Sequence, residues 1–507
     1  MKKVVLICLM AVVAHTLCGQ NVTVLKDNII TSYVATVVAE GHLVSSDNHL
    51  YIYQPGISGI NPEKMLDDKM YVLDKDGLAM SEIQCQHYGT LDYVNMYEDE
   101  DNIYILYSEW QKKTKTYSLY LSTVNKRENE VQADVEKVFS MTAEKRDGIY
   151  LFHSVSPDKK KPAFAVVVAS KKKDFKGSMA KCYGEKGEQL WENVLNFDIS
   201  DNTFSILDFV LDNNATAYAA VVSYSDVTKT ARRNETLQFV VITSDDERTY
   251  EESIKFGYLS SAKLKVSKDG NVVLGGFYCD NLSKNEVGAF WAKFDIQRSD
   301  FTIDNIKFPG DYYTKSIVFG IQPAMSNYST KAQYIEEYED GNLVLLGEMR
   351  TTICYVDSKG MTTYSFYAQN ISVVYADATG KINDFRVIKK GQLASSSSLS
   401  DTHYLRSQGF SYTPLMHNNK LYIFYNDAIA NYTGKTGYLS KPTMSPKQAS
   451  VFAVIVPGQP IASKLIMNGK ETKNRLVYPL IMDDDYVLGI GTNKKNKAEI
   501  IKVDYSF

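Results

Sequence analysis

Residues 267–295, SKDGNVVLGGFYCDNLSKNEVGAFWAKFD, decide the fold. The turn Asp269-Gly270 precedes an apolar run at residues 271–277, and a second apolar-aromatic run follows at residues 288–294. Asp-Gly supplies backbone angles that bulkier residues resist. The stretch therefore predicts two short strands joined by a polar loop.

Apolar runs that correspond to this unit recur along the chain at intervals of 53 to 79 residues. They begin near residues 50, 103, 163, 216, 271, 342, 421 and 486. A period of about 60 residues with four strands per unit is the signature of a β-propeller. We expect an all-β fold: a β-propeller of eight four-stranded blades. Seven blades, or two separate all-β domains, are the alternatives.

The last predicted unit ends at residues 498–504, one strand short of the others. A strand predicted at residues 22–26 has no partner nearby in the sequence. We expect this N-terminal strand to complete the last blade, because closure of the ring removes an open sheet edge. One domain is predicted, at residues 20–507.

Residues 1–19 have the pattern of a signal peptide. Lys2 and Lys3 precede an apolar core at residues 4–14, and Gly19 ends a tolerable cleavage site. The apolar core is too short to span a membrane, and no later stretch approaches the roughly 20 residues needed. We predict an exported protein, in the periplasm, at the cell surface or outside the cell.

The chain has six cysteines, of which Cys8 and Cys18 lie in the signal segment. Lipid anchoring at Cys18 is not expected, because a small residue should precede the anchored cysteine and Leu17 stands there. The other four are widely spaced and form no C-x-x-C motif, so a structural zinc site is not predicted. Free, buried thiols are predicted at Cys85, Cys182, Cys279 and Cys354.

The composition is that of a globular protein rich in strands. The chain has 507 residues, 44% hydrophobic and 23% charged, with 36 Tyr and only 12 Pro. Aromatic enrichment favours strands. The formal net charge of −4 argues against a nucleic-acid partner.

Two segments contain a recurring type of turn: residues 377–381 (DATGK) and residues 184–191 (GEKGEQLW). They resemble the repeats of bacterial quinoprotein-type propellers and their cofactor-free scaffold relatives, whose turns read Asp-x-x-Thr-Gly-Lys-x-x-Trp. The first segment lacks the Trp, and the second lacks the Asp and Thr. The resemblance implies that the glycine serves the turn and that Trp191 docks between blades. We favour this structural role over binding of pyrroloquinoline quinone and predict no cofactor.

No catalytic residue is assigned from the sequence. A Gly-x-Ser-x-Gly nucleophile elbow is absent. Propeller glycosidases use Asp and Glu side chains that face the ring axis. A glycan-active hydrolase with axial carboxylates is therefore the alternative function. The carboxylates available for it are Glu98, Glu336, Glu337, Glu339 and Glu348.

No metal site is predicted either. The six histidines after the signal segment are scattered singly. The acidic runs at residues 98–102 and 483–485 concentrate oxygen ligands but lack the alternating spacing of a calcium-binding loop. Both are interpreted as solvated turns.

Three long insertions, at residues 309–331, 390–409 and 427–448, lie around the last three predicted blades. Long loops on a rigid scaffold tend to carry binding residues, although ordinary loop drift is the alternative. The aromatic residues predicted to contact a ligand are Tyr312, Tyr313 and Tyr432. The expected function is a non-enzymatic binding or scaffold module of the bacterial cell envelope, with a protein or glycan ligand. That ligand would lie at the axial mouth or against the long loops of blades six and seven.

Overall fold

The computed structural model describes most of the chain. The described residues are 22–30, 41–44, 49–54, 69–74, 80–85, 91–98, 101–128, 130–142, 148–169, 175–184, 187–195, 204–225, 233–280, 285–310, 312, 328–396, 410–432, 448–472, 474–493 and 498–505. The predicted signal segment lies outside these residues. So does a first-blade strand expected at residues 34–39.

Eight antiparallel sheets, numbered here in chain order, make up the described part of the molecule. Sheet 1 contains β2 (Gly41–Val44), β3 (His49–Gln54), β4 (Lys69–Asp74) and β5 (Met80–Gln84). Sheet 2 contains β6 (Asp92–Glu98), β7 (Asn102–Gln111), β8 (Thr116–Asn125) and β9 (Glu130–Thr142). Sheet 3 contains β10 (Gly148–Val155), β11 (Pro162–Ala169), β12 (Phe175–Tyr183) and β13 (Gln189–Asn193). Sheet 4 contains β14 (Phe204–Leu211), β15 (Ala217–Ser225), β16 (Arg233–Ile242) and β17 (Glu247–Ser253).

The second half of the chain repeats the pattern, with one additional strand. Sheet 5 contains β18 (Tyr258–Val266), β19 (Val272–Cys279), β20 (Gly288–Asp295) and β21 (Asp300–Lys307). Sheet 6 contains β22 (Ser329–Glu337), β23 (Leu343–Val356), β24 (Thr362–Ala376), β25 (Ile382–Ile388) and β26 (Gln392–Ser396). Sheet 7 contains β27 (Tyr412–His417), β28 (Lys420–Asp427), β29 (Ala449–Ile455) and β30 (Ala462–Asn468). Sheet 8 contains β31 (Asn474–Met482), β32 (Tyr486–Asn493), β33 (Ala498–Asp504) and β1 (Val22–Ile30). Two short helical turns, η4 (Ile429–Asn431) and α4 (Gly469–Thr472), flank strands of sheets 7 and 8.

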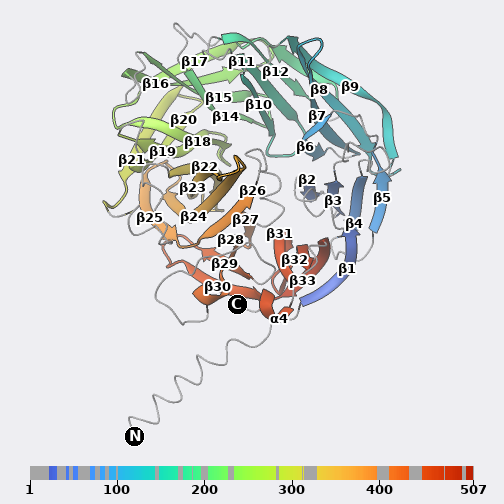
Figure 1. Cartoon of the computed structure of the whole chain (residues 1–507). Helices are drawn as coiled ribbons and strands as arrows, with labels where there is room; N and C mark the ends of the chain where they lie inside the picture. Colours follow the sequence, from blue (N-terminus) through green and yellow to red (C-terminus); the bar gives the residue numbers. More distant parts are fainter. Residues whose placement is uncertain are drawn as a thin grey trace.

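The sheets stand around a ring, in the arrangement of a β-propeller (Figure 1). The inner strands are β2, β6, β10, β14, β18, β22, β27 and β31, and the fourth strand of each sheet lies toward the outside. Neighbouring inner strands contact one another, and β31 contacts β2, so the last sheet adjoins the first. The all-β, repetitive architecture predicted from the sequence is confirmed.

Strand β1 belongs to the last sheet rather than to the first. It pairs antiparallel with β33, with Val22 opposite Val503 and Val24 opposite Ile501. The first described strand of the chain thus completes the sheet formed by its last three strands, as the sequence predicted.

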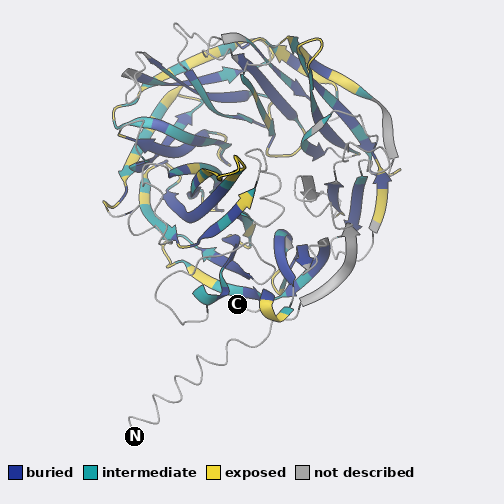
Figure 2. Cartoon of the chain, in the orientation of Figure 1, coloured by how far each residue is buried: buried dark blue, intermediate teal, exposed yellow. Residues whose placement is uncertain are grey.

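Most strands of the sheets consist largely of buried residues (Figure 2). Separate buried clusters occupy the junctions from sheets 1 and 2 through to sheets 7 and 8. In the junction of sheets 3 and 4, the indole N–H of Trp191 donates to the Ala215 carbonyl at 2.7 Å. This contact confirms that Trp191 docks between sheets, and Gly187 in the same turn has φ +76°.

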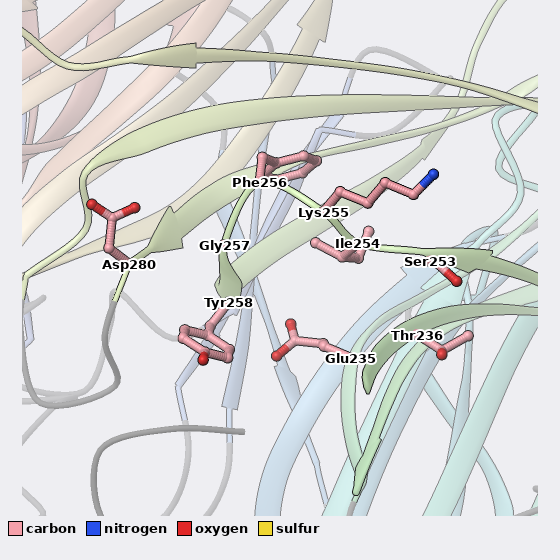
Figure 3. A pocket seen from close by; sticks show the side chains of 9 residues that line it. All are labelled: Glu235, Thr236, Ser253, Ile254, Lys255, Phe256, Gly257, Tyr258 and Asp280. Carbon is pink, nitrogen blue, oxygen red and sulfur yellow. The ribbon is translucent and has the colours of Figure 1, made fainter. Parts of the chain in front are cut away.

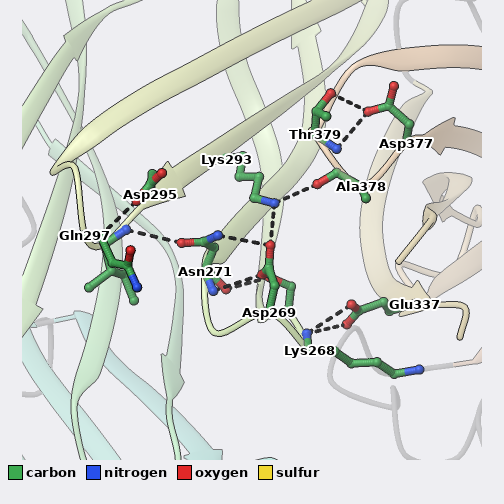
Figure 4. A network of polar contacts seen from close by, with 12 residues as sticks. Lys268, Asp269, Asn271, Lys293, Asp295, Gln297, Glu337, Asp377, Ala378 and Thr379 are labelled. Carbon is green, nitrogen blue, oxygen red and sulfur yellow. Dashed lines mark hydrogen bonds and ion pairs between the residues drawn. The ribbon is translucent and has the colours of Figure 1, made fainter. Parts of the chain in front are cut away.

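The stretch at residues 267–295 forms the predicted hairpin. Strand β19 is buried throughout, and β20 pairs with it along its length. In the turn before β19, Gly270 adopts φ +82° and donates its N–H to the Ser267 carbonyl at 2.9 Å. Asp269 accepts from Lys293 at 2.7 Å, and the backbone N–H of Lys268 donates to Glu337 of sheet 6 at 3.0 Å (Figure 4). The turn therefore links sheet 5 to sheet 6 as well as β18 to β19.

The connections at the two ends of the sheets differ in length. Because each sheet is antiparallel, its first and third hairpins lie at one end, here called the turn end. The second hairpin and the connection to the next sheet lie at the opposite end. All three predicted insertions attach at this opposite end, which we call the long-connection end.

Two sequence-based expectations need correction. The apolar runs of this sheet predict strands at residues 342–347 and 371–376, but β23 and β24 continue beyond them into a projecting hairpin. Strand β26 pairs with the projecting part of β24. Cys354 lies on this hairpin and is exposed, whereas Cys85, Cys182 and Cys279 are free and buried as predicted. The burial expected for Cys354 was wrong because the strand that carries it extends beyond the core.

Candidate functional site

A cluster of buried polar residues lies where the chain enters two of the three insertions, between sheets 6 and 7. Three of its residues stand next to residues 397–409 and 433–447, which lie outside the described residues: Gln392, Ser411 and Asp427. We call this group, with its ion-pair partners, the sheet 6–7 cluster. Its members are Glu348, Arg350, Lys390, Gln392, Ser411 and Asp427.

Two cations share one buried carboxylate in this cluster. The Lys390 ammonium lies 2.5 Å from Glu348 Oε1, and both side chains are 0% exposed. Arg350 Nε lies 2.5 Å from Glu348 Oε2, and the Arg350 side chain is 37% exposed. Burial opposes ionisation of Glu348, but the two cations outweigh it and hold the pKa of Glu348 below its usual value. Burial also lowers the pKa of Lys390.

Gln392 connects this ion-pair group to sheet 7. Its Oε1 accepts from the Lys390 ammonium at 2.9 Å and from the backbone N–H of Ser411 at 2.6 Å. Its Nε2 donates to the Asn426 carbonyl at 2.8 Å. The Ser411 hydroxyl donates to Glu348 Oε2 at 2.7 Å. Lys390 and Gln392 thus tie the start of one insertion to the strand that follows it.

Asp427 stands at the start of the other insertion and is 0% exposed. It accepts hydrogen bonds from the Ala428 N–H at 2.7 Å, from Asn431 at 3.0 Å and from the Tyr432 hydroxyl at 3.2 Å. Burial raises the pKa of Asp427 to about 6, against the opposing effect of these bonds and of Lys390. A buried carboxylate therefore fixes the turn from which residues 433–447 depart.

The structure separates the three predicted ligand-binding tyrosines. Tyr432 is partly buried and packs against the apolar cluster between sheets 6 and 7, and its hydroxyl lies 3.1 Å from that of Tyr425. Tyr312 is only 5% exposed and packs between sheets 5 and 6, where its hydroxyl lies 2.5 Å from Ser372. Tyr313 lies outside the described residues. Tyr432 and Tyr312 serve different sheet junctions, and a binding role for the three remains a prediction.

Polar pairs, rather than apolar side chains, bridge several neighbouring inner strands. Asn95 on β6 lies 3.0 Å from His153 on β10, and Lys263 on β18 lies 3.1 Å from Asp208 on β14. Asp208 also accepts from the Leu264 N–H at 2.8 Å. These contacts join sheet 2 to sheet 3 and sheet 4 to sheet 5 near the ring's centre. Both oxygens of the Asp208 carboxylate are bonded in this way.

The carboxylates considered for an axial hydrolase do not form a pair. Glu98 is buried against Lys126 at 2.6 Å, and Glu337 accepts the Lys268 N–H. Glu339 is exposed in a turn, and Glu336 lies 3.9 Å from Lys265. Glu348, described above, belongs to the sheet 6–7 cluster. Four of these carboxylates therefore already contact a cation or a backbone N–H: Glu98, Glu336, Glu337 and Glu348. An axial acid–base pair is not favoured.

A pocket of about 510 Å³ lies at the long-connection end of sheets 4 and 5 (Figure 3). Glu235, Tyr258 and Asp280 line it together with the segment that joins the two sheets. Glu235 Oε1 accepts the N–H of Leu259, the second residue of β18, at 2.6 Å. This carboxylate therefore fixes the start of the next sheet.

The same arrangement recurs one sheet further along the ring. Glu286, also buried, accepts the N–H of Thr330, the second residue of β22, at 2.7 Å. Two successive junctions thus use a buried glutamate to hold the following inner strand. Sequence reasoning missed both residues, because Glu235 lies near the start of the third strand of its sheet and Glu286 lies just before the third strand of the next, and neither has a local pattern to mark it.

The turn end has a larger pocket, of about 800 Å³, formed by the first turns of sheets 3, 4 and 5 and by β22. Its polar groups include Asn213, Asn214, Lys265 and Lys268. Asn213 accepts from the Asp158 N–H at 2.9 Å, so adjacent turns are joined here by hydrogen bonds. This end consists of short, closely tied turns.

One group of described residues has the composition of a metal site. Ligand atoms of His417, Asp483 and Asp484 lie within 4.8 Å of one another at the turn end. Asp484 is exposed and already accepts from Asn418 at 2.6 Å and contacts His417 at 2.9 Å. These contacts join the turns of sheets 7 and 8, which agrees with the prediction that residues 483–485 are a solvated turn.

No protein-family model matches the chain, and no curated protein is similar to it in sequence. Solved structures do resemble it. The β-propeller domain of the Trilobed protease from Pyrococcus furiosus is 8% identical; the match covers 84% of this chain and 93% of that domain, with a TM-score of 0.37. A protein of unknown function from Bacteroides caccae is 11% identical over 67% of this chain and 93% of its own, with a TM-score of 0.28. A polysaccharide lyase, ulvan lyase, is 10% identical over 60% of this chain and 75% of its own, with a TM-score of 0.37. At these identities and scores, none of them assigns an activity or ligand to this chain.

No helix in the described residues is long and apolar enough to cross a membrane.

Proposed function

We propose that this chain is an exported, eight-bladed β-propeller that acts as a non-enzymatic binding module of the bacterial cell envelope. Each of the eight sheets is one blade, and β1 closes the ring. The ligand, a protein or a glycan, binds at the long-connection end of sheets 6 and 7.

The sheet 6–7 cluster is the observation that carries this proposal. Burying charged groups is costly unless each is paired and hydrogen-bonded. Three charged residues of this cluster are fully buried: Glu348, Lys390 and Asp427. They hold the attachment points of two long insertions, and long loops on a rigid scaffold often carry binding residues.

A glycan-active hydrolase needs two carboxylates free to act as acid and as nucleophile or base. Asp208 and Glu336, on inner strands, each have a lysine partner. The binding role therefore agrees better with the contacts on the inner strands.

Affinity capture from envelope extracts tests the proposal. The bait is the protein with residues 433–447 replaced by a Gly-Ser segment of equal length, compared with the natural chain. A matched control carries Asn213→Ala and Asn214→Ala, which alter exposed side chains at the turn end. Loss of a specific partner in the first variant only is the expected result. Equal capture by all three proteins, or catalytic turnover of an envelope glycan that Asp208→Asn abolishes, would reject the proposal.

A further inference from the structure

Arg350 is the one accessible charge of the sheet 6–7 cluster. Its side chain is 37% exposed, whereas Glu348 and Lys390, which form its ion-pair group, are 0% exposed. Arg350 is therefore the point at which this buried group meets solvent.

The guanidinium of Arg350 is fixed in place along one edge only. Its Nε contacts Glu348 Oε2 at 2.5 Å, and its Nη2 donates to the Ser411 hydroxyl at 2.7 Å. A guanidinium has five N–H donors in a rigid plane. In the part of the chain that the structure describes, the two N–H groups of Nη1 and the second N–H of Nη2 have no partner. One N–H of Nη1 and the second N–H of Nη2 point the same way and form the end-on edge of the guanidinium, which is the edge that can hold a carboxylate with two parallel bonds.

The local charge balance favours an anion at this edge. Within the direct ion pairs, Lys390 and Arg350 place two positive charges against the single carboxylate of Glu348. The other acid of the cluster, Asp427, acts on the charge of Lys390 but is not among the groups that shift the pKa of Arg350. An incoming carboxylate would supply the second negative charge in a setting where water screens it poorly.

A second and independent feature lies beside Arg350. The Tyr412 side chain is 5% exposed, and its hydroxyl has no hydrogen-bond partner among the described residues. The rings of Tyr412 and Tyr334 are 5.5 Å apart, and both tyrosines influence the pKa of Arg350. A buried hydroxyl without a partner loses the hydrogen bonds it would make in water, so a ligand oxygen here would recover that loss.

We propose that Arg350 and Tyr412 form a binding site for a carboxylate-bearing ligand. The end-on edge of Arg350 holds the carboxylate, and the Tyr412 hydroxyl donates to one of its oxygens. Glu348 and Ser411 act as positioning residues that fix the guanidinium, and Lys390 supplies the compensating charge behind them. This inference deepens the proposed function, on which it rests for the location of the site, by naming the ligand chemistry.

Titration with defined carboxylates tests the site. The probes are trigalacturonate, which carries its carboxylates on sugar rings, and acetylated triglutamate amide, which carries them on a peptide. Their neutral counterparts are galactotriose and acetylated triglutamine amide. We expect calorimetry to show that the natural protein binds at least one carboxylate probe and not its neutral counterpart. Which probe binds separates the glycan from the peptide source.

Three variants locate the binding. Arg350→Gln should weaken it on the order of ten- to a hundredfold, because hydrogen bonds to charged groups contribute about 1.5–3 kcal/mol. Tyr412→Phe should weaken it several-fold without lowering thermal stability, since the hydroxyl that it removes has no partner among the described residues. Arg386→Gln is the matched control, because Arg386 lies on β25, the outer strand of sheet 6, where it pairs with Asp384 and donates to the Gln459 carbonyl of a turn in sheet 7.

Binding of neither carboxylate probe by the natural protein would overturn the inference. So would equal binding by Arg350→Gln and the natural protein. Because Arg350→Gln also changes the packing of the cluster, Tyr412→Phe gives a second and separate test. Undiminished carboxylate binding by Tyr412→Phe would overturn the proposal that the Tyr412 hydroxyl contacts the ligand. Partner capture that persists while both probes fail would reject this ligand class and leave the proposed binding function intact.

Discussion

At the scale of single residues, buried acids have distinct structural tasks in this protein. Glu235 and Glu286 each accept a hydrogen bond from the second residue of the next inner strand, and Asp427 accepts one at the start of an insertion. Sequence inspection offered Glu348 as one of five carboxylates, but only the structure shows it between Lys390 and Arg350. Along the chain, Arg350 lies two residues and Lys390 lies 42 residues from Glu348, and no sequence pattern links the three. Their pairing could therefore not be predicted.

The pKa of Asp427 leads to a pH-dependent prediction. Its value is raised from 3.8 to about 6 by burial, so the folded state favours the protonated form. The contribution of Asp427 to stability is therefore complete below about pH 4 and is lost as the pH rises through about 6. Each pH unit corresponds to about 1.4 kcal/mol, so the loss amounts to about 3 kcal/mol at most.

Asp427→Asn removes this dependence. Relative to the natural protein, the variant should gain stability between pH 5 and pH 7, with little gain at pH 4. Urea unfolding at several pH values measures the effect, and Asp300→Asn, at an exposed position, serves as the control. A difference between Asp427→Asn and the natural protein that does not change with pH would contradict the assignment.

At the scale of elements, the projecting hairpin of sheet 6 is the clearest departure from the repeat. Its strands β23 and β24 span 14 and 15 residues, longer than any other strand described. The tip exposes Tyr355, Val356 and Met361. The sequence contains one indication of this hairpin, because Asp357 and Gly360 bracket a turn like that at Asp269-Gly270. The regular repeat length nevertheless favoured shorter strands. Buried hairpins such as β19–β20 were predictable, because their apolar runs and turn residues act locally.

Cysteine reactivity tests the position of this hairpin. A maleimide should label Cys354 rapidly in the folded protein, and it should label Cys85, Cys182 and Cys279 only after denaturation. Burial raises the pKa of Cys182 to about 12, which suppresses its thiolate further. Mass spectrometry after a brief pulse reads out the labelled peptides, with Cys354→Ser as the control. Rapid native labelling of the other three, or protection of Cys354, would be inconsistent with the structure.

At the scale of the whole molecule, the repeat could be predicted well and the site only in outline. Eight similar apolar runs required eight small sheets, since each sheet must bury its faces against neighbours. The pairing of β1 with β33 was also predictable, because one strand was missing at one end of the chain and one was unpaired at the other. The positions of the insertions of sheets 6 and 7 could be read from the sequence, and their binding role stays a prediction. The charged residues beside them could not be predicted, because they depend on packing between sheets.

Removal of β1 tests ring closure. A protein that lacks Val22–Ile30 leaves β33 as an edge strand, with its outer backbone groups open to water. Amide hydrogens of β33 should then exchange faster, while those of β19, in sheet 5, should change much less. Hydrogen-exchange mass spectrometry measures both strands in one experiment. Unchanged protection of β33 would show that β1 does not stabilise the last sheet.

The proposed function places ligand binding at the long-connection end, beside sheets 6 and 7. The most direct measurement is photo-crosslinking in the native envelope, with a benzophenone amino acid placed at Val356 or, as the opposite-end control, at Lys420. Both positions are exposed, Val356 on the projecting hairpin and Lys420 at the turn end of sheet 7. We expect a crosslinked adduct from position 356 and none from position 420. An adduct from position 420 alone, or from neither position, would contradict it.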